Sequence, residues 1–406
     1  MGMVVFALGS VACGFAPVSG WGETWIIASR AGQGIGAALM MPASAAIVIS
    51  AFAPAARGRA MAAYAGISQL FLVVGPVVGG VLAEDWTWRA VFWLNVPVAL
   101  LSLVLVRVAK PANVAIPGSR MRYVDAALLV GGVLLTVLAI QQSSSWSWSS
   151  TTRPVLALGV LFLAVFTVHQ LVMADPLVNV RLLGRRAFLG ANLATAALQF
   201  ALTEVVLYGS LYNQQILGFS PIEGGLAALP LILGVAVASQ VGGRWYDRSS
   251  ARRPALTGLA LAFGGLALWT DALPGLDYRW QVPGMLLTGL GLGLTMSPLN
   301  TDALSRVADH QRGQAAGIVQ TMRQLGGTLG VAVIGTIVLN TLGTSTSRND
   351  AAHAVATGFA ASTGALVLAI LAAAWLLPKQ PRTPRQPDEQ PPTGENEVAG
   401  ETTNHG

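Results

Sequence analysis

The sequence predicts an all-α protein that crosses a membrane many times, with both chain termini on the cytoplasmic side. Of the 406 residues, 53% are hydrophobic and only 10% are charged, whereas a soluble globular protein carries about a quarter charged residues. The hydrophobic residues fall into long runs that match the roughly 20 residues a membrane helix needs. The basic residues lie between these runs, mostly in every second loop, and this pattern indicates a fixed orientation in the membrane.

Twelve hydrophobic runs are candidate membrane spans. Inside lipid, every backbone N–H and C=O group needs a partner within its own segment, so each run is expected to be an α-helix. The first run is short and begins at the N-terminal methionine without a polar flank. The predicted spans are Met3–Val18, Trp25–Ser50, Ala60–Ala83, Ala90–Val106, Val124–Gln142, Pro154–Met173, Phe188–Leu211, Ile222–Val241, Pro254–Thr270, Val282–Asn300, Ala315–Leu339 and Ala354–Leu377.

The 24 basic residues set the predicted orientation. With a cytoplasmic N-terminus, the inner loops and the C-terminal segment contain 18 of them, the outer loops four and the spans two, Arg30 and Arg323. Because basic residues stay on the cytoplasmic side of membrane proteins, this split places both termini inside. We therefore expect a multi-pass protein of the cytoplasmic membrane that has the lipid bilayer, and no nucleic acid, as its surroundings.

Several functional classes are disfavoured by the residues present. The single cysteine, Cys13, lies in a hydrophobic run, and the four histidines are widely scattered, so neither a disulfide framework nor a metal site is expected. No Ser/His/Asp or Cys/His arrangement points to an enzyme. The glycines at 32, 34 and 36 follow no predicted strand, so they do not make a nucleotide-binding loop. The glycines at 289, 291 and 293 are likewise expected to serve helix packing. We expect no cofactor.

The third predicted span contains a motif rich in glycine and proline, made of Gly75, Pro76, Gly79 and Gly80. A spacing of four places Gly75 and Gly79 on one helical face, where the missing side chains allow another helix to approach closely. Pro76 removes one backbone hydrogen bond and bends the helix. Ordinary packing of small residues is the alternative interpretation.

These residues carry a resemblance to a known family. The stretch from Ser68 to Leu82 resembles the antiporter signature of the major facilitator superfamily. The following Trp88-Arg89 and Asn95-Val96-Pro97 are similar to its fourteen-span drug:proton antiporters. Further segments that resemble the same family are residues 29–43, 214–230 and 323–332. The resemblance covers about residues 3–377 and implies a major facilitator fold in which the motif helix lies between two helix bundles and blocks leak.

The chain departs from the family pattern in its helix order. The antiporter motif lies on the third span, where the family has it on the fifth, so we expect the first two helices and their loop to be missing. A degenerate copy of that loop occurs at residues 243–253 and includes Asp247 and Arg248. The expected organisation is a partial N-terminal bundle of four spans (1–110), two central spans (111–187), a six-helix C-terminal bundle (188–378) and a disordered cytoplasmic tail (379–406).

Arg30 and Gln33 are candidates for the proton or substrate path. Arg30 lies several residues inside a span, where a charge costs about 2.5–3.5 kcal/mol on insertion scales and usually serves transport. Gln33 follows one turn later on the same face. The resemblance implies a role for Arg30 in proton coupling. The alternative is that Arg30 extends to the nearby outer interface.

Glu204 is the only acidic residue well within a predicted span. An apolar setting favours the protonated form of a carboxyl group, which can then take up and release a proton near neutral pH. Tyr208 and Tyr212 follow on the same helical face and are expected to form an aromatic wall for a flat, lipophilic substrate. A neutral carboxyl group bonded between helices, or one wetted from outside, is the alternative.

The remaining candidates are expected to act as gates or anchors. Asp302 and Arg323 lie near the inner ends of neighbouring spans, where they could pair with each other or with lipid phosphate. Asp125 opens the fifth span, where the helix dipole stabilises an acidic residue. Asp247 and Arg248 belong to the degenerate loop.

Taken with the resemblance, these residues predict proton-coupled efflux of small lipophilic drugs or antibiotics by alternating access, performed by a monomer in a bacterial cytoplasmic membrane. One alternative is a metabolite or lipid exporter of the same fold. Another is a truncated membrane protein that does not transport.

Overall fold

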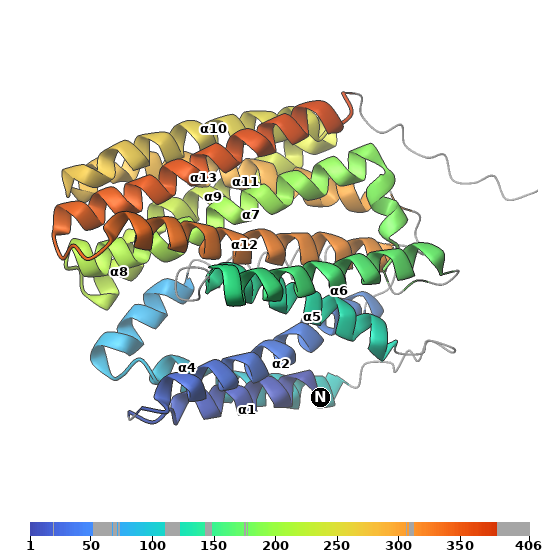
Figure 1. Cartoon of the computed structure of the whole chain (residues 1–406), viewed down its shortest axis with the longest axis horizontal. Coiled ribbons are helices and arrows are strands. Elements are labelled where there is room, and N and C mark those ends of the chain that lie inside the picture. The colour runs from blue at the N-terminus through green and yellow to red at the C-terminus, as the bar shows by residue number, and fades with distance from the viewer. Residues whose placement is uncertain are drawn as a thin grey trace, which may run out of the picture.

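The computed structural model describes residues 1–18, 20–51, 67, 71, 74–109, 122–142, 148–173, 176, 178–305, 307 and 312–379. Within these residues the secondary structure is helical and includes no strand (Figure 1), which confirms the predicted all-α class. The predicted tail lies outside the described residues from residue 380 onward. The long helices are α1 (Gly2–Gly14), α2 (Gly22–Ala51), α4 (Ala90–Ala109), α5 (Tyr123–Gln141), α6 (Arg153–Val172), α7 (Arg186–Leu211), α9 (Leu229–Arg248), α10 (Arg252–Ala272), α11 (Tyr278–Ser305), α12 (Arg312–Leu342) and α13 (Arg348–Leu376).

Shorter elements complete the described helices. They are the π-helical turns η2 (Trp148–Thr152) and η4 (Tyr212–Ile216), the 3₁₀ turns η3 (Val180–Gly184) and η5 (Leu273–Gly275), and α8 (Pro221–Ala227). Residues 74–85 are also helical, and we name this segment the motif helix. A turn at Ala228 separates α8 from α9, because Pro230 has no N–H to continue the hydrogen-bond ladder.

Nine helical segments in the described part of the chain are long and apolar enough to cross a membrane, and they coincide with the fourth to twelfth predicted spans. The first predicted span corresponds to α1, which has 13 residues, and the second to α2, which has 30. The third lies partly outside the described residues. The total of twelve spans therefore stays a prediction.

Glycine contacts hold α1 against α2. The backbone of Gly9 lies so close to Gln33 that a Cβ atom there would be 2.7 Å from the Gln33 nitrogen, and Gly36 similarly faces the backbone of Phe6. Helix α4 also packs on α1. Small residues permit this close approach, which van der Waals contact stabilises in lipid. These three helices lie together at the bottom of Figure 1.

Helices α7 and α9–α13 form a second group with a continuous buried core. Trp269 of α10 and Phe359 of α13 meet edge to face in this core, with 5.1 Å between their ring centroids. The glycines of α11 confirm the packing role predicted for them, because Gly289 and Gly293 abut backbone carbonyls of α9 while Gly291 abuts the backbone of α10. Alternate glycines thus fit α11 between two neighbours.

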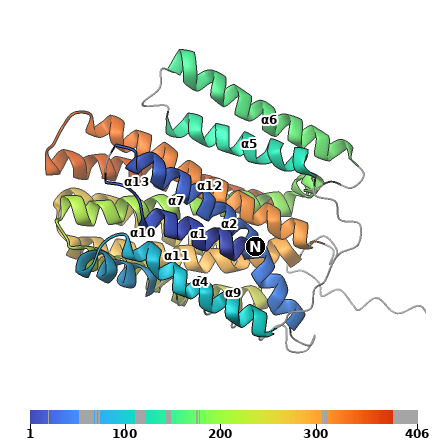
Figure 2. The same ribbon diagram turned by 90° about the horizontal axis from the view of Figure 1, so that it is seen from below.

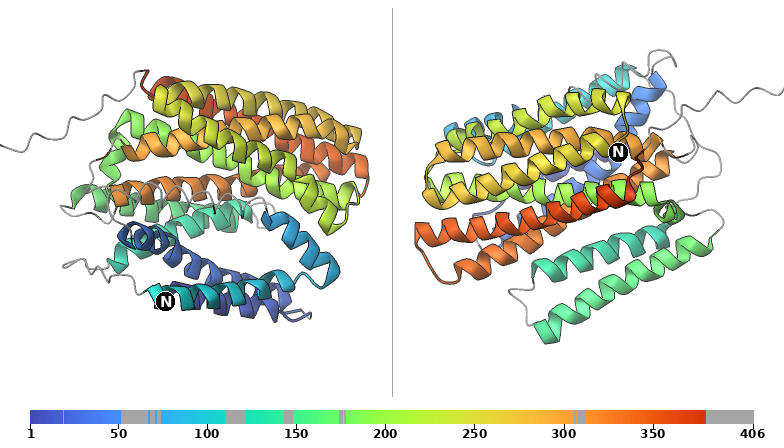
Figure 3. Two further views of the ribbon diagram at one scale, coloured as in Figure 1. Left: turned by 180° about the vertical axis from the view of Figure 1, so that it is seen from behind. Right: turned by 90° about the horizontal axis from the view of Figure 1, so that it is seen from above.

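The two central helices, α5 and α6, pack on each other at one side of the molecule. Helix α5 also contacts α12 of the second group. Figures 2 and 3 show the pair beside α12, away from the helices α9 and α10.

Candidate functional site

A chain of polar side chains connects α1, α2 and α4. The amide nitrogen of Gln33 donates to the hydroxyl of Ser10, which also accepts from the Asn95 side chain at 3.1 Å. Arg30 donates to the Gln33 carbonyl oxygen at 3.2 Å, and its guanidinium lies 5.7 Å from the ring centroid of Phe92. Gln33 is buried, whereas Arg30 is exposed. Arg30 and Gln33 therefore form one network, as their helical spacing predicted, and Ser10 is its unpredicted centre.

The motif helix contacts α8, the short helix that leads into α9 of the second group. A Cβ atom at Gly80 would lie 2.5 Å from the Pro221 carbonyl oxygen, and one at Gly225 would lie 2.5 Å from the carbonyl oxygen of Pro76. Each glycine therefore presses against backbone of the other element. Gly75 and Gly79, the expected contact pair, are different: a Cβ at either would meet no described atom within 4 Å. Packing at Gly75 and Gly79 therefore stays a prediction, whereas Gly80 makes the close contact with α8.

Glu204 is completely buried in the second group of helices. Neither oxygen of its carboxyl group has a hydrogen-bond partner among the described residues. The hydroxyl of Ser362 on α13, also fully buried, faces the carboxyl group, but its own hydrogen bond goes to the Gly358 carbonyl oxygen at 3.4 Å. Burying a carboxylate without donors or a cation is costly, so this setting favours the neutral acid.

The two tyrosines after Glu204 have different surroundings. Tyr208 is half-buried, and its hydroxyl lies against Gly335 of α12. Tyr212 is fully buried and donates its hydroxyl hydrogen to the carbonyl oxygen of Leu273 in η5. The expected aromatic wall was therefore wrong for Tyr212, because the π-helical turn that starts at this residue directs it into the core.

Asp125 takes part in a cluster at the inner end of the central pair. Its carboxyl group is almost fully buried, with one oxygen 2.7 Å from Nδ1 of His169 on α6 and the other 3.2 Å from Nε of Arg122. The helix-start position was predicted, but the His169 partner was not. The cluster ties α5 to α6 at the ends that the predicted topology places on the cytoplasmic side.

The other expected gate residues lie apart from one another. Asp247 and Arg248 lie at the end of α9 and are not buried. Asp302 is buried on α11. No ion pair between Asp302 and Arg323 is found among the described side chains, and their pairing with each other or with lipid phosphate stays a prediction. Arg323 is half-buried on α12, with an Nε atom that is enclosed and lacks a hydrogen-bond partner.

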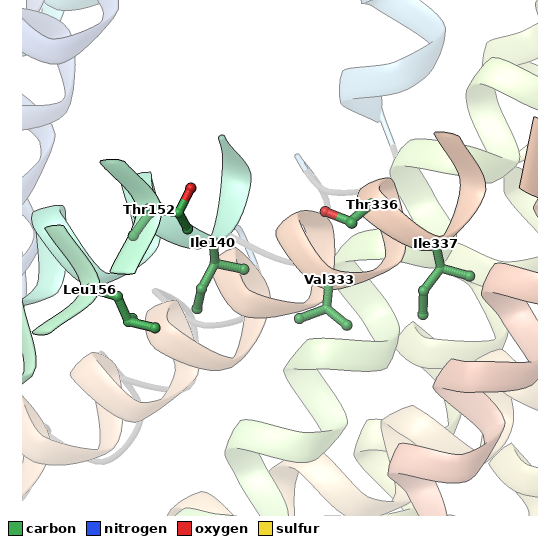
Figure 4. Close-up of a pocket in the computed structure, with 7 residues that line it drawn as sticks. Ile140, Thr152, Leu156, Val333, Thr336 and Ile337 are labelled. Atoms are coloured by element: carbon green, nitrogen blue, oxygen red, sulfur yellow. The ribbon is translucent and has the colours of Figure 1, made fainter. Parts of the chain in front are cut away.

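A small pocket of about 220 Å³ lies between the central pair and α12 (Figure 4). Its lining is apolar apart from the hydroxyl groups of Thr152 and Thr336. It contains none of the site residues predicted from the sequence. The polar groups described above therefore lie elsewhere in the helix groups and the central pair, rather than around this pocket.

Similar proteins identify the family. The family model of the Major Facilitator Superfamily matches residues 1–331. The chain is 33% identical to the puromycin resistance protein pur8 of Streptomyces alboniger, over 83% of this chain and 67% of the relative. It is 29% identical to the multidrug resistance protein Stp of Mycobacterium tuberculosis, over 83% of this chain and 62% of the relative. The chain thus spans about two thirds of the length of these relatives.

Solved structures show the same fold. A crystal structure of the peptide transporter POT in complex with sulfate aligns with a TM-score of 0.64 and 16% identity, over 94% of this chain and 80% of that one. A bacterial homologue of the human lysosomal transporter Spinster, in an inward-facing and occupied conformation, aligns with a TM-score of 0.57 and 15% identity, over 94% and 83%. The chain therefore belongs to the Major Facilitator Superfamily and is a multi-pass protein of the bacterial cytoplasmic membrane.

Proposed function

We propose that this chain exports small lipophilic compounds, antibiotics among them, in exchange for protons that enter the cell. Family membership supports a transport function, and the names of the relatives in Streptomyces and Mycobacterium support drugs as the substrates. Export against a concentration gradient needs an energy source. A proton gradient can drive it if the protein contains a group that takes up and releases a proton inside the membrane.

The observation that carries this proposal is the buried carboxyl group of Glu204. It is acidic and fully enclosed, and among the described residues it faces no cation and only the hydroxyl of Ser362. Burial costs little free energy when such a group is protonated and much more when it is charged. Loss of its proton therefore favours any rearrangement that brings water or a donor to the carboxylate, and this links the protonation state to the shape of the second group of helices.

Alternating access supplies the transport step. In this scheme the N-terminal bundle (1–110) and the C-terminal bundle (188–378) rock against each other around a substrate path near the bilayer midplane. The contacts of the motif helix with α8 then close the outer side. In the predicted topology the motif helix precedes one outer loop and α8 follows another, so both lie near the outer surface. The central pair (111–187) stays with α12, on which α5 packs.

The other polar residues have supporting roles in this proposal. Arg30 and Gln33 line the proton or substrate path, held in place by Ser10 and Asn95. Arg323 is a half-buried cation close to the helix contacts of α7 and α12, where it can attract an anionic group or gate the inner side. Asp125, Asp247, Arg248 and Asp302 act as anchors or gates near the cytoplasmic ends of their helices.

Transport by purified protein in liposomes tests the proposal. Puromycin is the first probe, because a relative is named for resistance to it. We expect puromycin to move in the direction opposite to an imposed proton gradient, and a proton ionophore to stop the movement. Puromycin movement that continues at the same rate in the presence of the ionophore would refute proton coupling. Activity with lipids or metabolites but not with a panel of antibiotics would favour the alternative exporter, and no transport of any compound would favour a non-transporting protein.

A further inference from the structure

One charged side chain of the motif helix bonds to the second group of helices. The Oε2 atom of Glu84 accepts a hydrogen bond from the backbone N–H of Ile222 at 3.0 Å, across 138 residues of sequence. The hydroxyl of Ser220 interacts with the same carboxylate. Glu84 itself is exposed and follows the third predicted span, so it lies in the outer loop.

Glu84 completes the hydrogen bonding at the start of α8. Ser220 and Glu223 form a reciprocal capping box, in which the Ser220 hydroxyl accepts from the Glu223 N–H and the Glu223 carboxylate accepts from the Ser220 N–H. Pro221 has no N–H. The N–H of Ile222 is then the donor that the local sequence leaves without an acceptor, and Glu84 supplies one from the opposite side of the contact.

We propose that Glu84 is a latch that holds the outer ends of the two groups of helices together, and that this latch must open when the transport path opens to the outside. The inference rests on the alternating-access function proposed above. Glu84 lies one turn beyond Gly80, which abuts the backbone of Pro221, so the hydrogen bond forms only when that close glycine contact is in place. Separation of the helices would leave both partners exposed to water, which can replace the bond, so the latch is reversible.

The charge on Glu84 persists at working pH. Its hydrogen bonds with Ile222 and Ser220 hold the pKa of this carboxyl below its ordinary value of 4.5. A lowered pKa means that the contact is at full strength above the ordinary value and is lost only as the pH falls through the lowered one. The other nearby titratable groups are Asp85, its neighbour, and Glu223, which is bonded to Ser220. Glu84 therefore biases the outer closure at neutral pH without sensing protons, which distinguishes it from Glu204.

Spin labels at the outer ends measure the latch directly. Cysteines replacing Thr24 of α2 and Thr346 before α13 are exposed, lie in the predicted outer loops and avoid the contact itself. Glu84→Ala removes the acceptor, Glu84→Gln keeps an acceptor oxygen but removes the charge, and Asp85→Asn is the matched control. We expect Glu84→Ala to raise the ratio of outward-open to closed molecules by about threefold at neutral pH, as for an exposed charged contact. The ratio of outward-open to closed molecules in Glu84→Gln should lie between the ratios in Glu84→Ala and in the unaltered protein.

The expected shift should be constant between about pH 6 and about pH 8, because Glu84 stays charged throughout that range. Equal distance distributions for Glu84→Ala and the parent would overturn the latch, and so would an equal shift in Asp85→Asn, which would indicate a general effect of charge. The measurement needs neither substrate nor a proton gradient. A chain that opens and closes but does not transport would therefore refute the proposed function while leaving the latch intact.

Discussion

The Nδ1 atom of His169 lies 2.7 Å from a carboxylate oxygen of Asp125, and this contact joins the two central helices at their inner ends. Asp125 is almost fully buried, whereas the side chain of His169 is 43% exposed. Loss of the histidine therefore leaves an enclosed carboxylate with one partner fewer, and loss of a hydrogen bond to a charged group costs about 1.5–3 kcal/mol.

We expect His169→Ala to lower the melting temperature of the detergent-solubilised protein by a few degrees. His353→Ala is the control, because His353 is an exposed histidine on α13 whose imidazole has no hydrogen-bond partner among the described residues. Fluorescence-monitored unfolding measures both variants side by side. If the two variants melt together, the contact between His169 and Asp125 does not stabilise the central pair.

Glu204→Gln should separate coupling from binding. The amide has the shape of the protonated acid but cannot release a proton, so the fold should persist while the variant stays in the protonated-like state. We expect at least a tenfold loss of proton-driven puromycin transport, with exchange of puromycin across a liposome membrane at equal pH retained. Glu23→Gln, at an exposed acidic residue in the first turn of α2, is the control. Full proton-driven activity in Glu204→Gln would exclude this residue from coupling.

Arg323→Met tests whether a half-buried cation serves function rather than stability. Arg323 has an enclosed Nε atom without a partner, and replacing a buried charge by an apolar side chain of similar length is often neutral or stabilising. We expect an unchanged or higher melting temperature together with slower transport. A fall in both the melting temperature and the transport rate would show that Arg323 is mainly structural. Arg186→Met, at an exposed arginine that begins α7, controls for the loss of one positive charge.

Much of the fold follows from the sequence because lipid imposes a simple rule. Each hydrophobic run must satisfy its own backbone, so the runs from Ala90 onward could be predicted as helices, and the alternate glycines of α11 as packing residues. Glu204 could be singled out because an acidic residue inside such a run stands out against its neighbours.

Pairings between distant segments could not be predicted in this way. Ser10, Glu84 and His169 are ordinary residues in their local sequence, and each becomes informative only when another helix brings a partner. The same limit applies to the motif helix. Its spacing placed Gly75 and Gly79 on one face but could not determine which glycine faces α8. That orientation depends on how the two groups of helices meet, and a helical repeat contains no information about it.

Neighbouring glycines on the motif helix provide the sharpest test of the outer contact. Gly80 leaves no room for a Cβ, because the Pro221 carbonyl oxygen and the Ile222 Cα are backbone atoms that cannot turn aside. A Cβ at Gly79 would meet no described atom within 4 Å. Gly79→Ala should be neutral, or should stabilise the helix by about 0.5–1 kcal/mol through backbone entropy. Gly80→Ala should instead push α8 away, widen the separation of labels at Thr24→Cys and Thr346→Cys, and slow transport. If the two alanine variants behave alike, the backbone contact between Gly80 and Pro221 is not what closes the outer side.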